Sequence, residues 1–174
     1  MAVADLNDVR CFYELLGHGE PLLLIPGLGV TSRIWDAVTP ELAEHFSLIL
    51  FDNRDVGQSQ GKRRPSRISD FSSDIIELLD YLQVDRVHVM GLSLGGVIAL
   101  QLAADHPQRI DHLVLASCTD RFTPYLRQVA LLLGKTVTAV KNTQYRALLR
   151  LTELLGSDHK VRHYLRGDQP AARR

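Results

Sequence analysis

Short apolar runs alternate with helix-like segments along the first 120 residues, and this alternation restricts the fold more than any other feature of the chain. The runs are rich in leucine and β-branched residues, as strands are, whereas the segments between them repeat their apolar residues with the period of a helix. Strands separated by helices of this length form a parallel sheet with right-handed crossovers. The sequence predicts strands near residues 3–6, 9–15, 22–25, 47–51, 87–90 and 113–116, and helices over 32–44, 69–82 and 94–105.

The rest of the chain has a different pattern. Residues 125–165 are typical of helix throughout, and the final residues are polar and basic. We therefore expect two regions, an α/β core over residues 1–120 and a helical, cap-like segment with a frayed basic end over residues 121–174. The predicted fold class is α/β, with a mostly parallel sheet of about six strands flanked by helices and followed by the helical segment. Pro40 falls inside the first predicted helix and should divide it into two short pieces.

Charge is distributed unevenly along the chain, although the formal net charge is zero. Up to Asp120 there are 9 basic and 17 acidic residues, and from Arg121 onward there are 11 basic and 3 acidic residues. The basic region either lies against the acidic one or creates a positive field over a site for an anionic substrate. Its basic residues are spread along apolar helical patterns without a groove-reading motif, which argues against a nucleic-acid partner.

Composition favours an ordinary globular protein. Hydrophobic residues make up 45% of the chain, enough for a sizeable core, and no apolar run approaches a membrane span of about 18 residues. The two cysteines, Cys11 and Cys118, are too few for a disulfide framework and lack metal-ligand spacing. There is no secretory pattern at the N-terminus, nor any nucleotide loop or flavin fingerprint. We expect a cytoplasmic protein in a reducing compartment, without a cofactor, a metal or a membrane partner.

One motif carries chemistry. The residues Gly91-Leu92-Ser93-Leu94-Gly95 match G-x-S-x-G and lie between a short apolar strand and an apolar helix. A serine on such a tight turn needs small neighbours, because side chains at positions 91 and 95 would collide across it. Its hydroxyl then points outward at a helix N-terminus, where backbone amides favour a developing negative charge. The alternative is an ordinary glycine-rich turn with a capping serine.

Three segments together resemble the α/β-hydrolase family over about residues 3–120. Leu24-Ile25-Pro26-Gly27-Leu28-Gly29 is similar to the family's loop after its third strand, with Pro26 where the family often has histidine. Asp52–Ser59 resembles the loop after the fourth strand, and Gly91–Gly96 resembles the nucleophile elbow. Three motifs in the right order are far more specific than any one of them.

The resemblance implies roles for individual residues. Ser93 would be the nucleophile, the backbone amides of Leu28 and Leu94 would form the oxyanion hole, and Gly27 and Gly29 would let the backbone approach the substrate. Trp35 either packs in the core or lid or forms a pocket wall that contacts substrate. The charged side chains of the second segment, Asp52, Arg54 and Asp55, are expected to hold their loop by ion pairs.

The general base and its acid are harder to place. In this family they follow the serine in the order acid, then histidine. His106 and His112 are expected at the end of the sheet opposite Ser93, whereas His159 and His163 lie beside Asp158 in the helical region. Asp120 occupies a position that some family members use for the acid. It is either that acid or a loop or helix-cap residue.

The resemblance implies a serine hydrolase of small carboxylic esters or lactones, with a small-molecule, ester-like substrate. The family's last strands and its acid–base segment have no counterpart here, so we expect the N-terminal part of a hydrolase. Two alternatives remain open: a truncated, non-catalytic binding module, or a hydrolase-fold enzyme of other chemistry, such as a haloperoxidase or C–C hydrolase. Without further strands, residues 112–117 would form an exposed apolar edge, which predicts poor solubility or self-association.

Overall fold

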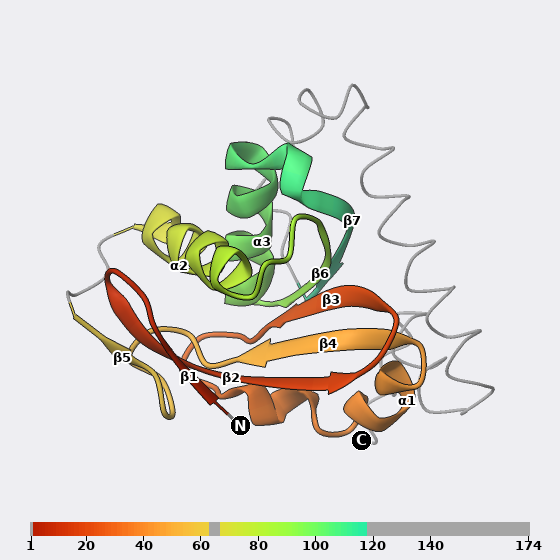
Figure 1. Cartoon of the computed structure of the whole chain (residues 1–174). Coiled ribbons are helices and arrows are strands. Elements are labelled where there is room, and N and C mark those ends of the chain that lie inside the picture. Colours follow the sequence, from red (N-terminus) through yellow and green to blue (C-terminus); the bar gives the residue numbers. More distant parts are fainter. Residues whose placement is uncertain (1, 63–66, 118–174) are drawn as a thin grey trace, which may run out of the picture.

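The computed structural model of the protein describes residues 2–62 and 67–117. Its strands and helices follow the predicted alternation (Figure 1). The strands are β1 (Ala2–Asp5), β2 (Val9–Gly17), β3 (Glu20–Ile25), β4 (Phe46–Phe51), β5 (Gln60–Gly61), β6 (Val87–Leu92) and β7 (Ile110–Ala116). The helices are η1 (Ser32–Trp35), α1 (Thr39–Ala43), α2 (Ile68–Tyr81), α3 (Leu94–Asp105) and η2 (Pro107–Arg109), of which η1 and η2 are 3-10 helices.

These strands form one sheet in the order β1-β2-β4-β3-β6-β7, with β5 paired to β2. Strands β4, β3, β6 and β7 are parallel, whereas β1, β2 and β5 pair in the antiparallel sense. The predicted mostly parallel α/β sheet is therefore confirmed. Because the parallel strands all end at the same edge, the loops that follow β3, β4 and β6 gather there.

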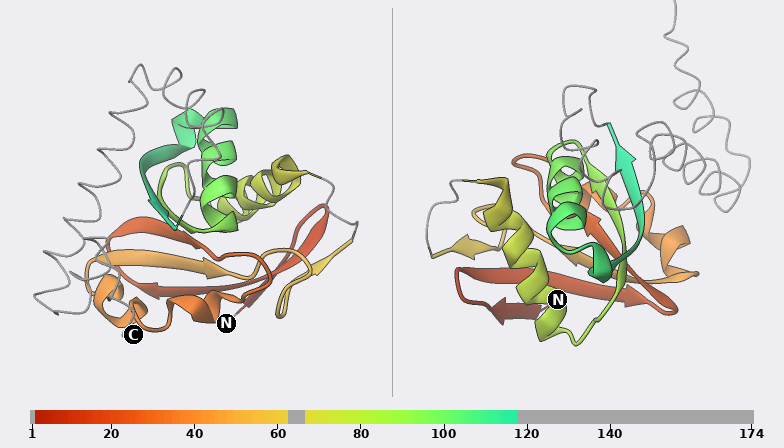
Figure 2. Two further views of the ribbon diagram at one scale, coloured as in Figure 1. Left: turned by 180° about the vertical axis from the view of Figure 1, so that it is seen from behind. Right: turned by 90° about the horizontal axis from the view of Figure 1, so that it is seen from above.

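Helices cover both faces of this sheet. Helices α2 and α3 lie on one face, and η1 and α1 lie on the other (Figure 2). Alternate residues of the parallel strands therefore enter two cores. One contains Leu23, Ile25, Val87 and Val89 with apolar residues of α2 and α3. The other contains Leu22, Leu24, Leu48, Leu50 and Met90 with Trp35 and Leu42. Strands that are buried on both faces read as continuous apolar runs, which explains the sequence pattern.

Helix α2 shows how local sequence sets an element. The carboxylate of Asp70 accepts a hydrogen bond from the Arg67 amide at 2.9 Å and satisfies one donor that the helix start would otherwise leave unpaired. Ile75, Leu78 and Leu79 then form the apolar stripe that packs on the sheet. No helix within the described residues is long and apolar enough to cross a membrane.

The structure differs from the sequence-based expectations mainly at strand ends. Strand β7 begins at Ile110 rather than residue 113, and β5 lies inside a segment expected to be loop. The predicted break in the first helix is confirmed, because η1 ends at Trp35 and Pro40 lies in the first turn of α1. The helical region predicted for residues 121–174 lies outside the described residues, so the division at residue 120 stays a prediction.

Candidate functional site

Ser93 connects the end of β6 to the start of α3 through a strained backbone. Its φ of 53° and ψ of −114° lie in a region that residues with a side chain rarely adopt. The turn is fixed on both sides: the Ser93 amide donates to the carbonyl oxygen of Ala116 at 2.9 Å, and the Ser93 carbonyl accepts from the Gly96 amide at 3.0 Å. The residue is exposed. A serine is therefore presented at the N-terminus of a twelve-residue helix.

The glycines on either side of Ser93 are required by space. A Cβ atom at Gly91 would lie 2.4 Å from the carbonyl oxygen of Gly95, and one at Gly95 would lie 2.2 Å from the carbonyl oxygen of Ile25. Neither backbone atom can move aside as a flexible side chain could. The predicted reason for glycine at these positions is thus visible in the packing of the turn.

The loop after β3 passes directly beside Ser93. A Cβ atom at Gly27 would lie 3.6 Å from the Ser93 Cβ, so the two segments are in contact distance of each other. Leu28 is 79% exposed, and Gly29 has a φ of 67°, where a Cβ atom would meet nothing within 4 Å. The structure brings Gly27 and Ser93 together as expected. The oxyanion role of the Leu28 and Leu94 amides stays a prediction.

The side chains of Asp52 and Asn53, which directly follow β4, bond to the loop after β3. Asp52 accepts the Ser32 amide at 2.8 Å through Oδ1 and the Gln58 amide at 3.0 Å through Oδ2. Asn53 donates from Nδ2 to the Pro26 carbonyl oxygen at 3.2 Å. Both side chains are buried. The β3 loop is therefore fixed near each of its ends by side chains of the neighbouring strand's loop.

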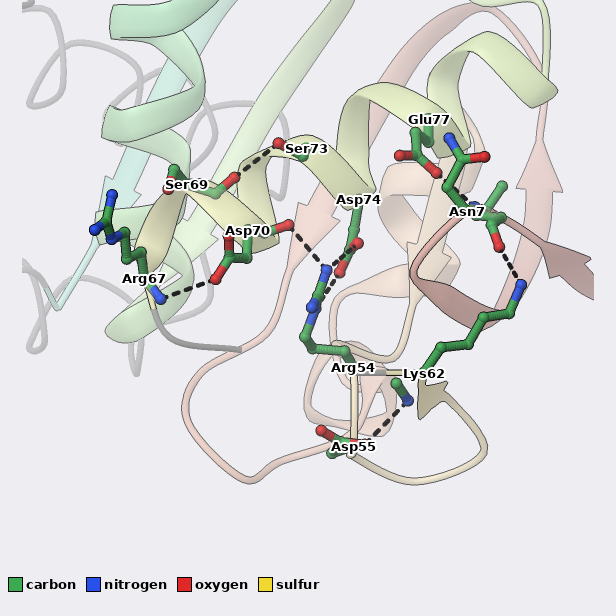
Figure 3. Close-up of polar contacts among 12 residues, drawn as sticks. Asn7, Arg54, Asp55, Lys62, Arg67, Ser69, Asp70, Ser73, Asp74 and Glu77 are labelled. Atoms are coloured by element: carbon green, nitrogen blue, oxygen red, sulfur yellow. Dashed lines mark hydrogen bonds and ion pairs between the residues drawn. The ribbon is translucent and has the colours of Figure 1, made fainter. Parts of the chain in front are cut away.

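Arg54 anchors the β4 loop to α2 (Figure 3). Its guanidinium donates to Asp74 Oδ2 at 2.6 Å through Nε, and to Asp74 Oδ1 and the Asp70 carbonyl oxygen through Nη2. The Arg54 guanidinium also lies 5.9 Å from the centre of the Phe71 ring. Burial raises the pKa of Asp74, and the Arg54 guanidinium opposes that shift. The two-bond geometry stabilises the ionised forms of this pair, and both side chains are buried.

The charged residues of the β4 loop thus act in different ways. Arg54 forms the expected ion pair, with Asp74 as its partner. Asp52 instead accepts backbone amides, and Asp55 accepts the Gly61 amide at 3.0 Å. The expectation that all three hold the loop by ion pairs needs this correction. Carboxylates at a turn have unpaired amides within reach, and these bonds need no cation.

Neither described histidine after Ser93 lies near the serine. His106 follows α3, whose twelve residues separate it from Ser93 by about 18 Å at a rise of about 1.5 Å per residue. His112 lies in β7, four residues before the Ala116 carbonyl that binds Ser93, or about 13 Å along the strand. Asp120, Asp158, His159 and His163 lie outside the described residues, and their roles stay predictions. Trp35 is buried in the core beneath the sheet, which favours packing, and its contact with substrate stays a prediction.

Sequence reasoning missed Asn53 and Asp74 as supports of the site. Asp74 had a usable signal, since an acidic residue on the apolar face of an amphipathic helix needs a buried partner. Asn53 carried no comparable signal, because its partner is a backbone carbonyl 27 positions away.

Comparison with known proteins identifies the family. The sequence model described as "alpha/beta hydrolase fold" matches residues 20–173. The putative carbamate hydrolase RutD of Azorhizobium caulinodans is 31% identical over 128 residues, which cover 74% of this chain and 48% of RutD. An uncharacterised protein of Mycobacterium tuberculosis is 36% identical over 112 residues, covering 64% of this chain and 33% of that protein. The chain thus spans about a third to a half of the length of these curated relatives.

Solved structures agree with this assignment. The enol-lactonase from Burkholderia xenovorans LB400 superimposes with a TM-score of 0.65 at 25% identity, covering 85% of this chain and 58% of the lactonase. Est816, described as an N-acyl homoserine lactone degrading enzyme, superimposes with a TM-score of 0.64 at 31% identity, covering 67% and 45% of the two chains. The chain belongs to the α/β-hydrolase fold family.

Proposed function

We propose that this chain supplies the nucleophile half of a serine hydrolase that acts on small carboxylic esters or lactones, with Ser93 as the nucleophile. The backbone of Ser93 carries the proposal: an exposed serine is held at φ 53° on a strand-to-helix turn, beside a glycine loop. Local strain of this kind persists only where surrounding contacts enforce it, and it gathers at functional sites. A plain glycine-rich turn with a capping serine needs no such conformation.

The reaction follows acyl transfer. The Ser93 Oγ forms a bond to the substrate carbonyl carbon, and the π electrons of the carbonyl move to its oxygen, which accepts hydrogen bonds from the Leu28 and Leu94 amides. Collapse of this intermediate breaks the bond to the leaving oxygen, which takes up the proton of Ser93 through a base. Water then cleaves the acyl-serine to give a carboxylic acid and restores the serine hydroxyl.

The base belongs, in this proposal, outside the described residues. All five described histidines lie in segments that lead into, or begin, the parallel strands: His18 before β3, His45 before β4, His88 in β6, and His106 and His112 at β7. That edge of the sheet is opposite the Ser93 turn. We place the base and its acid in residues 118–174, with Asp120, Asp158, His159 and His163 as candidates, or in a complementing segment.

Relatives support an ester-like substrate class. A lactone and a carbamate both contain an acyl carbon bonded to oxygen, and relatives of this chain are named as a lactonase and a putative carbamate hydrolase. The apolar side chains of Leu28 and Val30, in the loop that passes Ser93, and of Ile34, in η1 after that loop, are exposed, which favours an apolar acyl group on the substrate. A cytoplasmic location is part of the proposal, since the Cys11 thiol is free and buried.

A fluorophosphonate probe tests the proposal, because it labels a serine only when the hydroxyl is activated. We expect labelling of the 174-residue chain at Ser93, read by peptide mass spectrometry, and its loss in Ser93→Ala. Ser73→Ala is the matched control, since Ser73 is an exposed serine on α2. If the chain alone is not labelled and a complementing C-terminal segment restores labelling, the base lies in that segment and not in residues 118–174. Absence of labelling in both would reject the nucleophile assignment.

Self-association through the sheet edge is a further part of the proposal. Among the strands of residues 2–62 and 67–117, β7 lies at the end of the sheet order, and a strand at a sheet edge pairs readily with another chain. Size-exclusion chromatography with light scattering should give a dimer or larger species. A monodisperse monomer over the micromolar range would contradict it.

A further inference from the structure

Three adjacent parallel strands place Glu20, His88 and His112 side by side, at the end of the sheet opposite Ser93. Glu20 begins β3, His88 is the second residue of β6, and His112 lies near the start of β7. The order β3-β6-β7 makes them neighbours. His88 lies on the α1 face of the sheet with Met90, which belongs to the core containing Trp35.

An irregularity in the strand register brings the two histidines together. Val87 pairs with Ile110, but Val89 pairs with Leu113, so β7 has one extra residue opposite His88. In a regular ladder His112 would point to the same face as Val89, which packs against α2 and α3. A bulge shifts the alternation of side chains by one. His112 therefore turns to the face of His88.

The contact that results is between two imidazole nitrogens. His112 Nδ1 lies 3.1 Å from His88 Nδ1, and His88 Nε2 lies 3.0 Å from Glu20 Oε2. In the tautomer in which His88 donates its Nε2 proton to Glu20, its Nδ1 presents a lone pair toward His112. A carboxylate that orients the outer nitrogen of a histidine in this way is typical of metal-ligating histidines.

The distances between the rings fit a shared ion. Two nitrogens that each lie about 2 Å from one Zn²⁺ at a tetrahedral angle are about 3.3 Å apart. The two Nδ1 atoms are 3.1 Å apart, and the ring centres are 4.9 Å apart.

We propose that His88 and His112 bind a divalent transition-metal ion through their Nδ1 atoms, with Glu20 orienting His88. Water completes the coordination, because no group of three or more potential ligands in residues 2–62 and 67–117 could hold a metal ion. Binding moves the His112 Nδ1 proton to its Nε2. Imidazole nitrogens select zinc, copper or nickel rather than magnesium or calcium.

The surroundings admit such an ion. The His88 side chain is 14% exposed and His112 is exposed, so solvent reaches the pair. The Asp111 carboxylate, next to His112 in the chain, is bound by the Arg86 guanidinium at 2.6 Å. The Phe46 ring contacts His88 edge-on and limits its rotation. Glu20 thus supplies the carboxylate of the site, since that of Asp111 is paired with Arg86.

Isothermal titration of the full chain with Zn²⁺, Cu²⁺ and Mg²⁺ tests this proposal. We expect Cu²⁺ to bind more tightly than Zn²⁺, and Mg²⁺ not to bind at this site. His112→Gln should reduce Zn²⁺ affinity to the level of the double variant H88Q/H112Q, and Glu20→Gln should weaken it about tenfold. His106→Gln is the control on the same edge and should bind as the parent does. Circular dichroism verifies that each variant is folded.

A second readout separates this site from binding elsewhere. Saturating Zn²⁺ should raise the Tm of the parent and of His106→Gln but not that of His112→Gln, because an ion that binds only the folded state stabilises it. His112 is exposed, so this variant should fold even if His88→Gln does not. Equal Zn²⁺ affinity in the parent and in His112→Gln would overturn the proposal.

Discussion

Gly95 packs so closely against the end of β3 that a Cβ atom on it would lie 2.2 Å from the carbonyl oxygen of Ile25. Gly95→Ala should therefore lower the free energy of unfolding by about 1–3 kcal/mol or more, as overpacking does. Gly27→Ala is the matched control, because its nearest neighbour would be at 3.4 Å and the change should stay within about 0.5 kcal/mol. Urea unfolding measures both. Equal losses would contradict the account of the turn.

Because the Ser93 backbone is strained, glycine at this position should give a more stable protein than alanine. Ser93→Gly should have a free energy of unfolding about 0.5–2 kcal/mol higher than Ser93→Ala, measured by urea unfolding, because glycine adopts φ 53° without a Cβ penalty. Both variants remove the same hydroxyl, so its other interactions cancel in the comparison. An Ser93→Gly variant that is less stable than Ser93→Ala would show that the turn is not strained.

Removing one partner of the Arg54–Asp74 pair should destabilise the protein much more than replacing both partners by apolar residues. Asp74→Asn leaves the buried Arg54 charge without its carboxylate, and we expect a loss of about 3–5 kcal/mol. The double variant R54M/D74L removes both charges and should recover most of that loss. Chemical denaturation of both variants checks this. A double variant as unstable as Asp74→Asn would mean that the pair itself, rather than charge burial, sets the stability.

The two carboxylate oxygens of Asp52 each accept a backbone N–H. An asparagine side chain in its place would have only one oxygen that can accept. Asp52→Asn leaves either the Ser32 or the Gln58 amide without its acceptor, at a cost of about 1–3 kcal/mol. Asp55→Asn keeps the one acceptor that the Gly61 amide uses and should change stability by less than about 0.5 kcal/mol. Thermal unfolding of the two variants measures the difference. Similar losses would show that charge, not acceptor number, matters in this loop.

Burial raises the pKa of the Cys11 thiol to about 12. In a Cys118→Ser background, native protein should therefore not react with a thiol reagent at pH 8, whereas the urea-unfolded chain should react fully. The unfolded thiol loses its proton near pH 8.5, well before the folded one. The free energy of unfolding should fall as the pH rises from about 8.5 toward 12. Cys11→Ala should lack that part of the slope, and fast labelling of the native thiol would contradict the burial.

Much of the core was predictable because local sequence and tertiary context agree there. Helix α3 has the bounds expected from its apolar run, the preceding serine and Pro107. Strand β7 was predicted too short because Asp111 and His112 are polar and exposed, and β5 was missed because two residues carry no alternation.

At the candidate site, sequence indicated the residues whose backbone geometry is special and missed those that act through distant partners. The requirement for glycine at positions 91 and 95 could be predicted, because any larger residue would collide with the backbone there. The support from Asn53 depends on how two loops meet, and the meeting of His88 with His112 depends on a register shift between β6 and β7. Neither relation has a signature in the local sequence.

Within the described part of the chain, residues from Ile25 to Ala116 supply backbone contacts that fix the Ser93 turn. Grafting another hydrolase's C-terminal portion onto this chain after Ser117 would keep all of these backbone contacts. Under the proposed function, chimaeras built this way would vary the acid, the base and the substrate range one donor at a time, while the Ser93 turn stays the same.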